Sequence, residues 1–153
     1  MENAHAGIQY GSVIPSLAFD NSVAAIEWYQ QVFGARERMR LENPDKTIAH
    51  AEIEIGGSIV MLADEDTQYN STPIRLGGNS VNLHVYVPDV DALFQKAVAQ
   101  GAKIIIPVAN QFYGDRSGRL QDPFGYVWIV ATHVRDVSVE EMKKAFEEMA
   151  KNG

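Results

Sequence analysis

The sequence contains no cysteine among its 153 residues. This absence excludes disulfide bonds, thiolate zinc sites and a cysteine nucleophile. The sequence also lacks any run near the ~18 consecutive apolar residues that a membrane helix needs, and residues 1–11 show no charged-then-apolar signal pattern. We therefore expect a cytoplasmic protein that has no membrane partner.

Basic residues are scarce, with 13 Lys and Arg against 20 Asp and Glu, for a net charge of -7. We therefore expect no nucleic-acid partner, and the charge would attract cations rather than phosphates. Hydrophobic residues make up 46% and charged residues 22%, both near the average of globular proteins. This composition predicts a single folded domain over residues 12–153. Residues 1–11 are expected to be a flexible N-terminus.

Periodicity divides the first half into a strand, a helix and three further strands. Apolar residues at helical spacing begin after three candidate N-cap residues, Asp20-Asn21-Ser22, and end at Gly34, which suits the left-handed conformation of a helix end. Alternation of apolar and polar residues before Gly56-Gly57 indicates a strand that turns back through a two-residue hairpin. The predicted elements are, in order, Val13–Phe19, Val23–Phe33, Arg36–Leu41, Thr47–Ile55 and Ser58–Ala63.

The second half repeats this order after a polar segment, Asp64–Asn79, that is typical of a linker. A shift of about 68 residues aligns Asp20 with Asp89 and Gly34 with Gly101, which indicates an internal repeat. We expect a hairpin around Gly114 to Gly118. The other predicted elements are Asn82–Val87, Val90–Gln100, Lys103–Val108 and Tyr126–Ala131.

An amphipathic helix is predicted over residues 138–151, after the second repeat. Ser138 and Glu141 form a capping box, and the apolar residues that follow at helical spacing are expected to dock on the chain's own domain. His133, before this helix, is expected to make a structural hydrogen bond to the loop that leads into it. The repeats, over about residues 12–64 and 80–132, and this helix predict an α+β fold.

Short motifs occur along both repeats. They are residues 25–35 with Trp28-Tyr29 and Gly34-Ala35, His50-Ala51-Glu52-Ile53, Val87-Pro88-Asp89-Val90, Phe112-Tyr113-Gly114-Asp115-Arg116-Ser117-Gly118, and Asp122-Pro123-Phe124-Gly125. Over residues 12–150 the chain resembles the vicinal oxygen chelate superfamily, which includes glyoxalase I, bleomycin-resistance proteins and extradiol dioxygenases, and in particular its PhnB-like branch. The resemblance implies two tandem β-α-β-β-β modules that form a curved sheet around a ligand cavity, and a homodimer.

The resemblance also indicates where the superfamily's enzymes hold a divalent metal, at one position on each of four strands. In this chain those positions are Val13, Met61, Asn82 and Ile129. Hydrocarbon side chains cannot coordinate a metal, and a thioether suits copper(I), whereas zinc needs at least three protein ligands. We therefore expect no metal there and no other cofactor. A relocated metal site built from His50, His84 and Glu52 is the alternative.

Strand alternation and the implied fold predict which side chains line the cavity. The expected lining combines polar and apolar residues: His50, Glu52, Met61, Asn82, His84, Tyr86 and Ile129. Phe112 and Tyr113 would stack on a planar ligand at its mouth. Arg116 would bind a ligand carboxylate or phosphate, or else pair with Asp115 to hold the hairpin.

Three functions remain open from the sequence. The first is a metal-independent small-molecule-binding protein that sequesters a drug or metabolite, as bleomycin-resistance proteins do. The second is a lyase or isomerase in which His84 or Glu52 acts as a general base. The third is a glyoxalase-like or dioxygenase-like enzyme with the relocated metal site.

Overall fold

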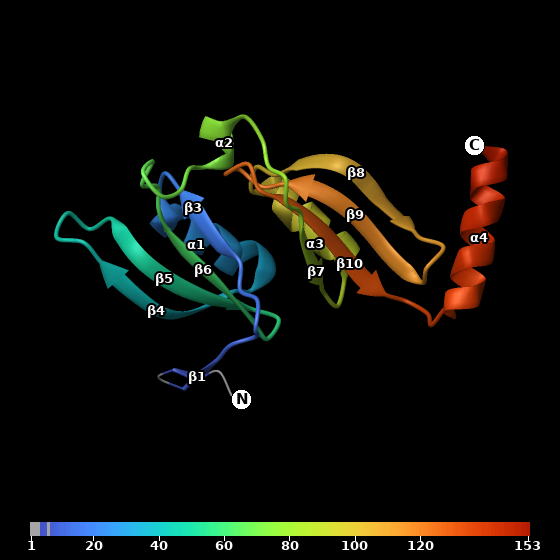
Figure 1. Ribbon diagram of the computed structural model, residues 1–153, viewed down its shortest axis with the longest axis horizontal. Coiled ribbons are helices and arrows are strands. Elements are labelled where there is room, and N and C mark those ends of the chain that lie inside the picture. The colour runs from blue at the N-terminus through green and yellow to red at the C-terminus, as the bar shows by residue number, and fades with distance from the viewer. Residues whose placement is uncertain (1–3, 6) are drawn as a thin grey trace. The chain divides into compact units, whose positions relative to one another are not determined.

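The computed structural model describes residues 4, 5 and 7–153, and these fold into two compact units. The N-terminal unit comprises the chain up to Ser80 together with Pro123–Tyr126, and the C-terminal unit comprises Val81–Asp122 and Val127–Gly153. Each unit contains a four-stranded sheet with a helix against one face (Figure 1). The predicted α+β fold of two tandem β-α-β-β-β modules is confirmed.

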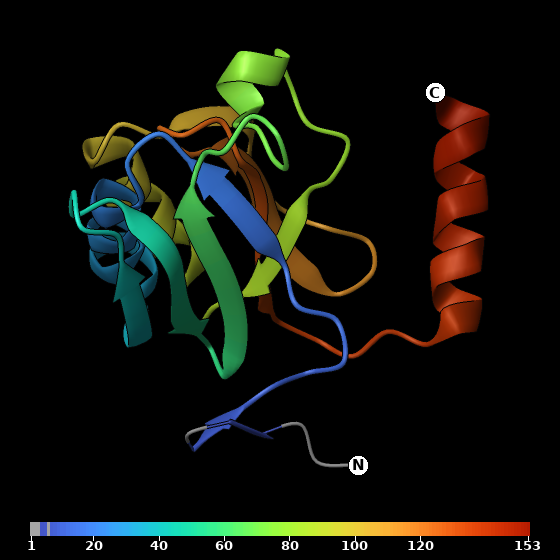
Figure 2. The same cartoon turned by 60° about the vertical axis from the view of Figure 1, so that its left-hand side comes forward.

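The N-terminal unit is built from β3 (Ser16–Phe19), α1 (Ser22–Phe33), β4 (Arg36–Glu42), β5 (Ile48–Ile55) and β6 (Ser58–Asp64). Its strands lie in the order β3-β6-β5-β4, with β3 parallel to β6 and the other pairs antiparallel. α1 covers one face of this sheet (Figure 2). It buries Ala25, Ile26 and Tyr29, while Ala51 and Ile53 are buried on β5.

Local signals set the ends of these elements largely as predicted. Asn21 caps α1, because its side-chain oxygen accepts from the Ala24 amide at 3.1 Å, and Gly34 ends the helix at φ 67°. Gly56 and Gly57 both have positive φ, as a two-residue hairpin turn requires. β3 begins later than predicted because Pro15 has no amide hydrogen for the ladder.

Two short features lie outside the predicted elements. β1 (Ala4–His5) pairs with β2 (Ile8–Gln9) inside the expected flexible N-terminus, of which residues 1–3 and 6 lie outside the described residues. α2 (Pro73–Leu76) lies inside the expected linker, where the Thr72 hydroxyl accepts from the Arg75 amide at 3.2 Å. Side-chain caps therefore order a segment that has no apolar periodicity.

The C-terminal unit is built from β7 (Leu83–Tyr86), α3 (Val90–Ala99), β8 (Lys103–Asn110), β9 (Asp115–Gln121) and β10 (Val127–His133). Its strands lie in the order β7-β10-β9-β8, with β7 parallel to β10 and the other pairs antiparallel. The predicted hairpin is present and Gly114 lies in its turn, but the turn does not extend to Gly118. The chain turns before Asp115, and Gly118 lies within β9 because the Phe94 ring of α3 packs where a side chain would stand.

An aromatic cluster fills the core of the N-terminal unit and explains the Asp-Pro-Phe-Gly motif. The Phe124 ring lies 5.3 Å from Phe19 and 6.3 Å from Trp28 between ring centroids. The Tyr126 hydroxyl donates to the carbonyl of Ala18 and accepts from its amide, both at 2.8 Å. Tyr126 therefore satisfies the outer edge of β3, the first strand of the sheet.

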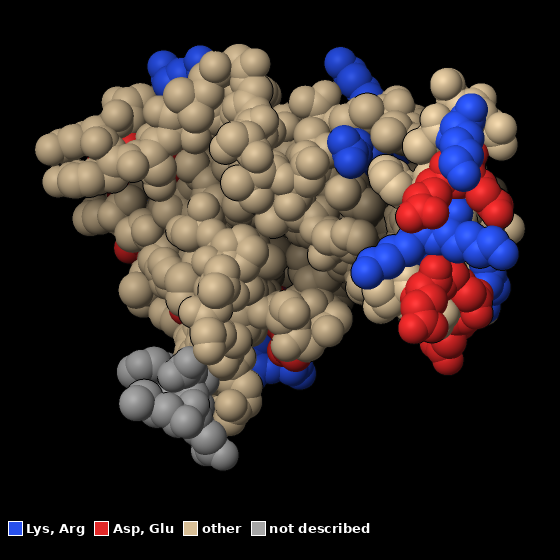
Figure 3. Space-filling view, turned by 45° about the vertical axis from the view of Figure 1, so that its right-hand side comes forward, with Lys and Arg blue, Asp and Glu red and all other residues tan. Residues whose placement is uncertain are grey.

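The C-terminal helix, α4 (Val139–Asn152), forms as predicted, with the Ser138 hydroxyl accepting from the Glu141 amide at 3.2 Å. None of its residues, all of which are described, is buried. Basic and acidic side chains gather over it (Figure 3). Its apolar stripe does not dock as extensively as predicted: Phe146 contacts Phe112, while Val139 and Met149 are exposed.

Among the described residues, no helix combines the length and apolar character needed to cross a membrane.

Candidate functional site

The C-terminal sheet has two chemically different faces. Gly118, Leu120 and Val130 lie toward α3, and the side chains of Leu120 and Val130 are fully buried there. Because side chains alternate along a strand, the residues between them point to the opposite face, which we call the distal face. The distal face comprises His84, Tyr86, Asp115, Ser117, Arg119, Ile129, Ala131 and His133.

The register of β7, β10 and β9 arranges these side chains in rows. Neighbours across the strands are His84, Ile129 and Arg119 in one row, and Tyr86, Ala131 and Ser117 in the next. The rings of His84 and Tyr86 stack, with centroids 5.2 Å apart and an interplanar angle of 25°. The structure thus brings three predicted site residues, His84, Tyr86 and Ile129, onto one face. A fourth, Asn82, is exposed and directly precedes β7.

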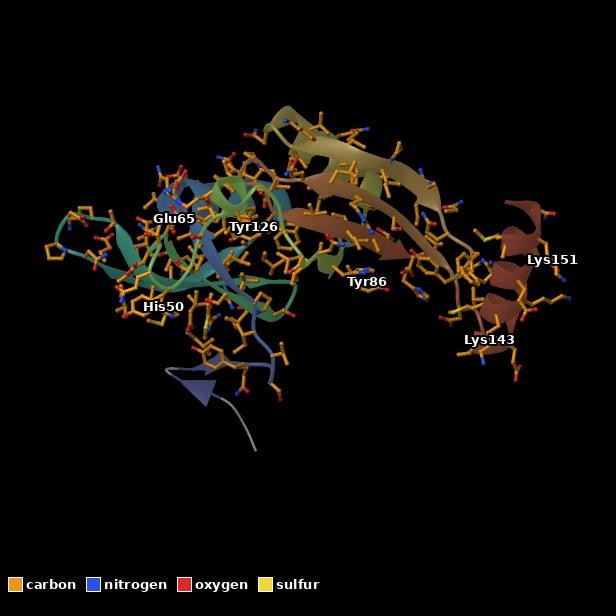
Figure 4. All side chains as sticks on the ribbon, turned by 45° about the horizontal axis from the view of Figure 1, so that its top comes forward. His50, Glu65, Tyr86, Tyr126, Lys143 and Lys151 are labelled. Atoms are coloured by element: carbon orange, nitrogen blue, oxygen red, sulfur yellow. The ribbon has the colours of Figure 1, made fainter. Side chains whose placement is uncertain are left out.

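Asp115 is the buried acid of the distal face, with 4% of its surface exposed. Its carboxylate accepts from the Tyr86 hydroxyl at 2.7 Å and contacts His133 Nδ1 at 3.0 Å. His133 Nε2 lies 2.7 Å from Asp136, in the loop that leads to α4. The structural hydrogen bond predicted for His133 is therefore present. Asp115 fixes the rings of both His133 and Tyr86, and Figure 4 labels Tyr86.

The hydrogen bonds of this cluster shift the pKa values of its members. Burial raises the pKa of Asp115, but the hydrogen bonds from His133 and Tyr86 outweigh burial and hold that pKa below its ordinary value. The hydrogen bond to Asp115, followed by that to Asp136, raises the pKa of His133. The same carboxylate raises the pKa of Tyr86. Near neutral pH, Tyr86 is therefore a neutral donor beside an ionised Asp115.

Arg116 lies on the opposite face of β9 from Asp115, so the predicted pair between them does not form. The Arg116 guanidinium instead binds Asp91 of α3 through two nitrogens, at 2.7 and 2.9 Å. In the preceding turn, the Tyr113 hydroxyl lies 3.4 Å from Ser117 Oγ on the distal face, and the Phe112 ring packs edge-on against Tyr113. Had residues 115–121 been recognised as a strand, the alternation of side chains would have placed Asp115 and Arg116 on opposite faces.

In the N-terminal unit, the structure brings Glu52, His50 and Met61 together. Glu52 is buried on β5 with 3% of its surface exposed, and Met61 is its neighbour across the strands. Its carboxylate accepts from the Tyr10 hydroxyl at 2.5 Å and lies 3.1 Å from His50 Nε2. The hydrogen bond to Glu52 raises the pKa of Tyr10. Tyr10 was not predicted, because it lies in the expected flexible segment.

Arg119 is a further distal-face residue that the sequence analysis missed. It is half-buried, and its Nε is fully buried without a hydrogen-bond acceptor. In the part of the chain that the structure describes, its guanidinium makes no ion pair. Its position two residues beyond Ser117 would have assigned it to this face, had β9 been recognised as a strand.

A polar cavity of about 700 Å³ lies in the N-terminal unit between the start of β5 and the segment after β6. Its carboxylates already have partners in the chain. Asp64 accepts from the amides of Ser22 and Ile48, and Glu65 binds Arg75. The Arg75 hydrogen bond lowers the pKa of Glu65 to about 2. These contacts hold the segment that leads to α2.

The sequence pattern of the Glyoxalase/Bleomycin resistance protein/Dioxygenase superfamily matches residues 15–130. The chain belongs to this superfamily. It is 39% identical over 135 residues to the uncharacterized protein Mb0911c of Mycobacterium bovis, covering 86% of this chain and 89% of that one. Among solved structures it resembles TioX from Micromonospora sp. ML1, with 31% identity, a TM-score of 0.61 and coverage of 81% and 100%. FosX from Listeria monocytogenes, complexed with Mn(II) and sulfate, shares the fold at 16% identity and a TM-score of 0.60, with coverage of 89% and 97%.

The metal positions that the superfamily resemblance implies carry unsuitable side chains here. Val13 is 90% exposed and precedes β3, Met61 is a thioether on β6, and Ile129 is a hydrocarbon on β10. Asn82 alone offers an oxygen ligand, so this set does not fit a divalent cation. Of the relocated set, His50 and Glu52 lie in one unit and His84 in the other. Across residues 4, 5 and 7–153, no three His, Cys, Asp or Glu side chains are grouped to hold a metal.

Proposed function

We propose that this protein binds a small molecule on the distal face of the C-terminal sheet without a metal ion, as a sequestering member of its superfamily. The observation that carries the proposal is the stacked pair of His84 and Tyr86, which adjoins Ile129 and Ala131. Aromatic and apolar surface with a few fixed polar groups is the usual composition of a small-molecule site. Phe112-Tyr113 and the Asp122-Pro123-Phe124-Gly125 motif also support assignment to the PhnB-like branch.

Preorganisation of Tyr86 favours binding as its role. Its hydroxyl is already held by the buried Asp115, so the ring loses little rotational freedom when a ligand stacks on it. Tyr86 is 58% exposed, which leaves ring surface available for such contact. A planar, partly apolar ligand matches this surface because aromatic pairs favour offset stacking.

Metal independence is supported by the chemistry of the ligand positions. Three of the four carry hydrocarbon or thioether groups, so restoring a divalent centre would need several substitutions. We expect protein purified without chelator to contain less than about a tenth of an equivalent of Ni, Zn, Fe or Mn, since zinc needs at least three protein ligands. Elemental analysis measures this, and stoichiometric metal in washed protein would contradict metal independence.

A thermal-shift screen in EDTA tests the binding function. We expect planar aromatic compounds to raise the melting temperature, because a ligand that binds only the folded state stabilises it. His84→Ala should weaken binding of each hit by about 3- to 10-fold, the loss of one stacking contact. Tyr69→Ala, at a side chain that is 80% exposed in the N-terminal unit, is the matched control. Hits that require added metal, or that bind His84→Ala unchanged, would contradict the proposal.

The second candidate is a lyase or isomerase that uses His84 as a general base. Among the described residues, the His84 ring stacks on Tyr86 but makes no hydrogen bond, so its nitrogens are available to a substrate. Proton transfer by such a group contributes about 10²–10⁴-fold to a rate. NMR spectra of each hit during prolonged incubation separate the candidates. A chemical change that is lost in His84→Ala would establish catalysis, and an unchanged ligand would favour sequestration.

A further inference from the structure

Arg119 differs from the other arginines of this chain. Arg36, Arg38, Arg40, Arg75 and Arg116 each bind a carboxylate of the chain itself. Arg135 lies exposed in the loop before α4. Within the described residues, Arg119 has no carboxylate partner, although its Nε is buried. A buried donor without an acceptor lowers stability, so its presence in a folded protein needs an explanation.

We infer that Arg119 anchors an oxyanion of the ligand, a carboxylate or a phosphonate, while the aromatic body of the ligand lies on His84 and Tyr86. This inference rests on the proposed function and names the ligand class. A guanidinium donates two parallel hydrogen bonds to such a group, and these charge-assisted bonds are about twice as strong as neutral ones. Because no described carboxylate forms an ion pair with Arg119, its half-buried guanidinium is free to bind such a group.

The surroundings of Arg119 favour an external anion. Its neighbours across the strands are Ile129 on β10 and Ile106 on β8, and apolar neighbours strengthen a charge-assisted bond by excluding water. Asp115, the acid of the same face, lies on β9 two residues before Ser117, whereas Arg119 lies two residues after it. The Asp115 carboxylate is already bound by Tyr86 and His133. An oxyanion from a ligand is therefore the missing partner.

The strand register sets the shape of the ligand. His84 and Arg119 lie two strands apart with Ile129 between them. Adjacent strands are about 4.8 Å apart, so the backbones of β7 and β9 are separated by roughly 10 Å. An aromatic ring that is joined to an oxyanion through a linker of a few bonds spans this distance. Such a ligand would cover Ile129 and place its ring on the stacked pair.

Four phenylalkyl probes that differ in their polar end group test the ligand class: 3-phenylpropionate, 2-phenylethylphosphonate, 3-phenylpropionamide and 3-phenylpropylamine. Binding is followed by NMR of 15N-labelled protein, at the amides of Tyr86 and Ser117 and at the Arg119 Nε–H signal, which is assigned by its loss in Arg119→Gln. We expect at least one anion to bind about tenfold or more tightly than the amide, the effect of a charge-assisted hydrogen bond. The anion that binds more tightly identifies the oxyanion.

Two variants make the assignment specific. Arg119→Gln should remove the preference for the anion without lowering the melting temperature, because Arg119 holds no carboxylate of the chain. Arg135→Gln removes the same charge from the exposed loop and should keep the preference. Equal affinity for anion and amide, or an anion preference that survives Arg119→Gln, would overturn the inference while the binding function stands. If none of the four probes shifts the distal face while a hit of the thermal-shift screen does, the inference fails and the proposed function stands.

Discussion

Tyr126 holds the edge of β3 through a single hydroxyl group. This hydroxyl pairs with both the amide and the carbonyl of Ala18, and the bonds are buried. Tyr126→Phe leaves both backbone groups without a partner, which should lower the free energy of unfolding by about 1–3 kcal/mol. Urea unfolding measures the change. Tyr69→Phe, at an exposed ring, is the matched control, and equal stability of the two variants would refute this role.

His133 should titrate above its ordinary pKa because Asp115 and Asp136 both stabilise the imidazolium. Since the folded pKa is raised, the stabilisation is fully present below pH 6.5, the ordinary value, and is lost as the pH rises through the folded pKa. Histidine NMR titration measures the pKa. We expect a value above 6.5 that falls toward 6.5 in Asp115→Asn. Asp20→Asn, at an exposed site in the N-terminal unit, should leave it unchanged; no fall in Asp115→Asn would contradict the contact.

The sequence indicated some residues of the distal face but not others. His84, Tyr86 and Ile129 could be predicted because they lie on short alternating strands whose faces follow from parity. Asp115 and Arg119 could not be assigned to that face, since their roles depend on where β9 begins. Contacts between distant segments, such as Tyr10 with Glu52, leave no local signal.

At the scale of elements, Gly118 permits α3 to approach β9. A Cβ there would lie 2.7 Å from Phe94 Cζ and 3.0 Å from the Ile106 carbonyl oxygen. Gly118→Ala should therefore lower the free energy of unfolding by about 1–3 kcal/mol through overpacking. Gly11→Ala is the control, since its Cβ would meet its nearest neighbour at 3.7 Å. Equal unfolding midpoints in urea would contradict this close packing.

Elements with a clear period and a cap were predicted well. α1, α3 and α4 each begin after an Asn, Asp or Ser cap, and the helix boundaries agree with the pattern within two residues. α2 was not predicted because its four residues are too few to show a helical period of apolar side chains. The β8–β9 turn was predicted to extend to Gly118 because that residue resembles a turn glycine, whereas a tertiary contact with α3 is what requires it.

For the whole molecule, the homodimer and the cytoplasmic location remain predictions. The exposed apolar residues of α4, Val139, Phe146 and Met149, support the dimer. Light scattering after size exclusion should give twice the chain mass of 16.9 kDa. Phe146→Glu should shift the protein toward the monomer because it places a charge in the apolar stripe. Lys143→Glu, a charge change at another position of α4, should not; a wild-type monomer would refute the prediction.

The net charge and the inference about Arg119 favour ligands of opposite charge. The value of -7 suggested an attraction for cations, whereas the distal face exposes a half-buried arginine without a carboxylate partner in the described chain. A bound ligand responds most to the charges that it touches, because surface charges more than about 8–10 Å away are screened by salt. Composition therefore indicates solubility but does not determine which ligand is bound.

A crystal structure of chelator-treated protein with the strongest hit of the thermal-shift screen tests the binding function most directly. We expect density for the ligand on the distal face, against the rings of His84 and Tyr86, with no metal ion between ligand and protein. A ligand held through a bound cation, or one seated in the polar cavity beside Glu65 and Arg75, would contradict the proposed function.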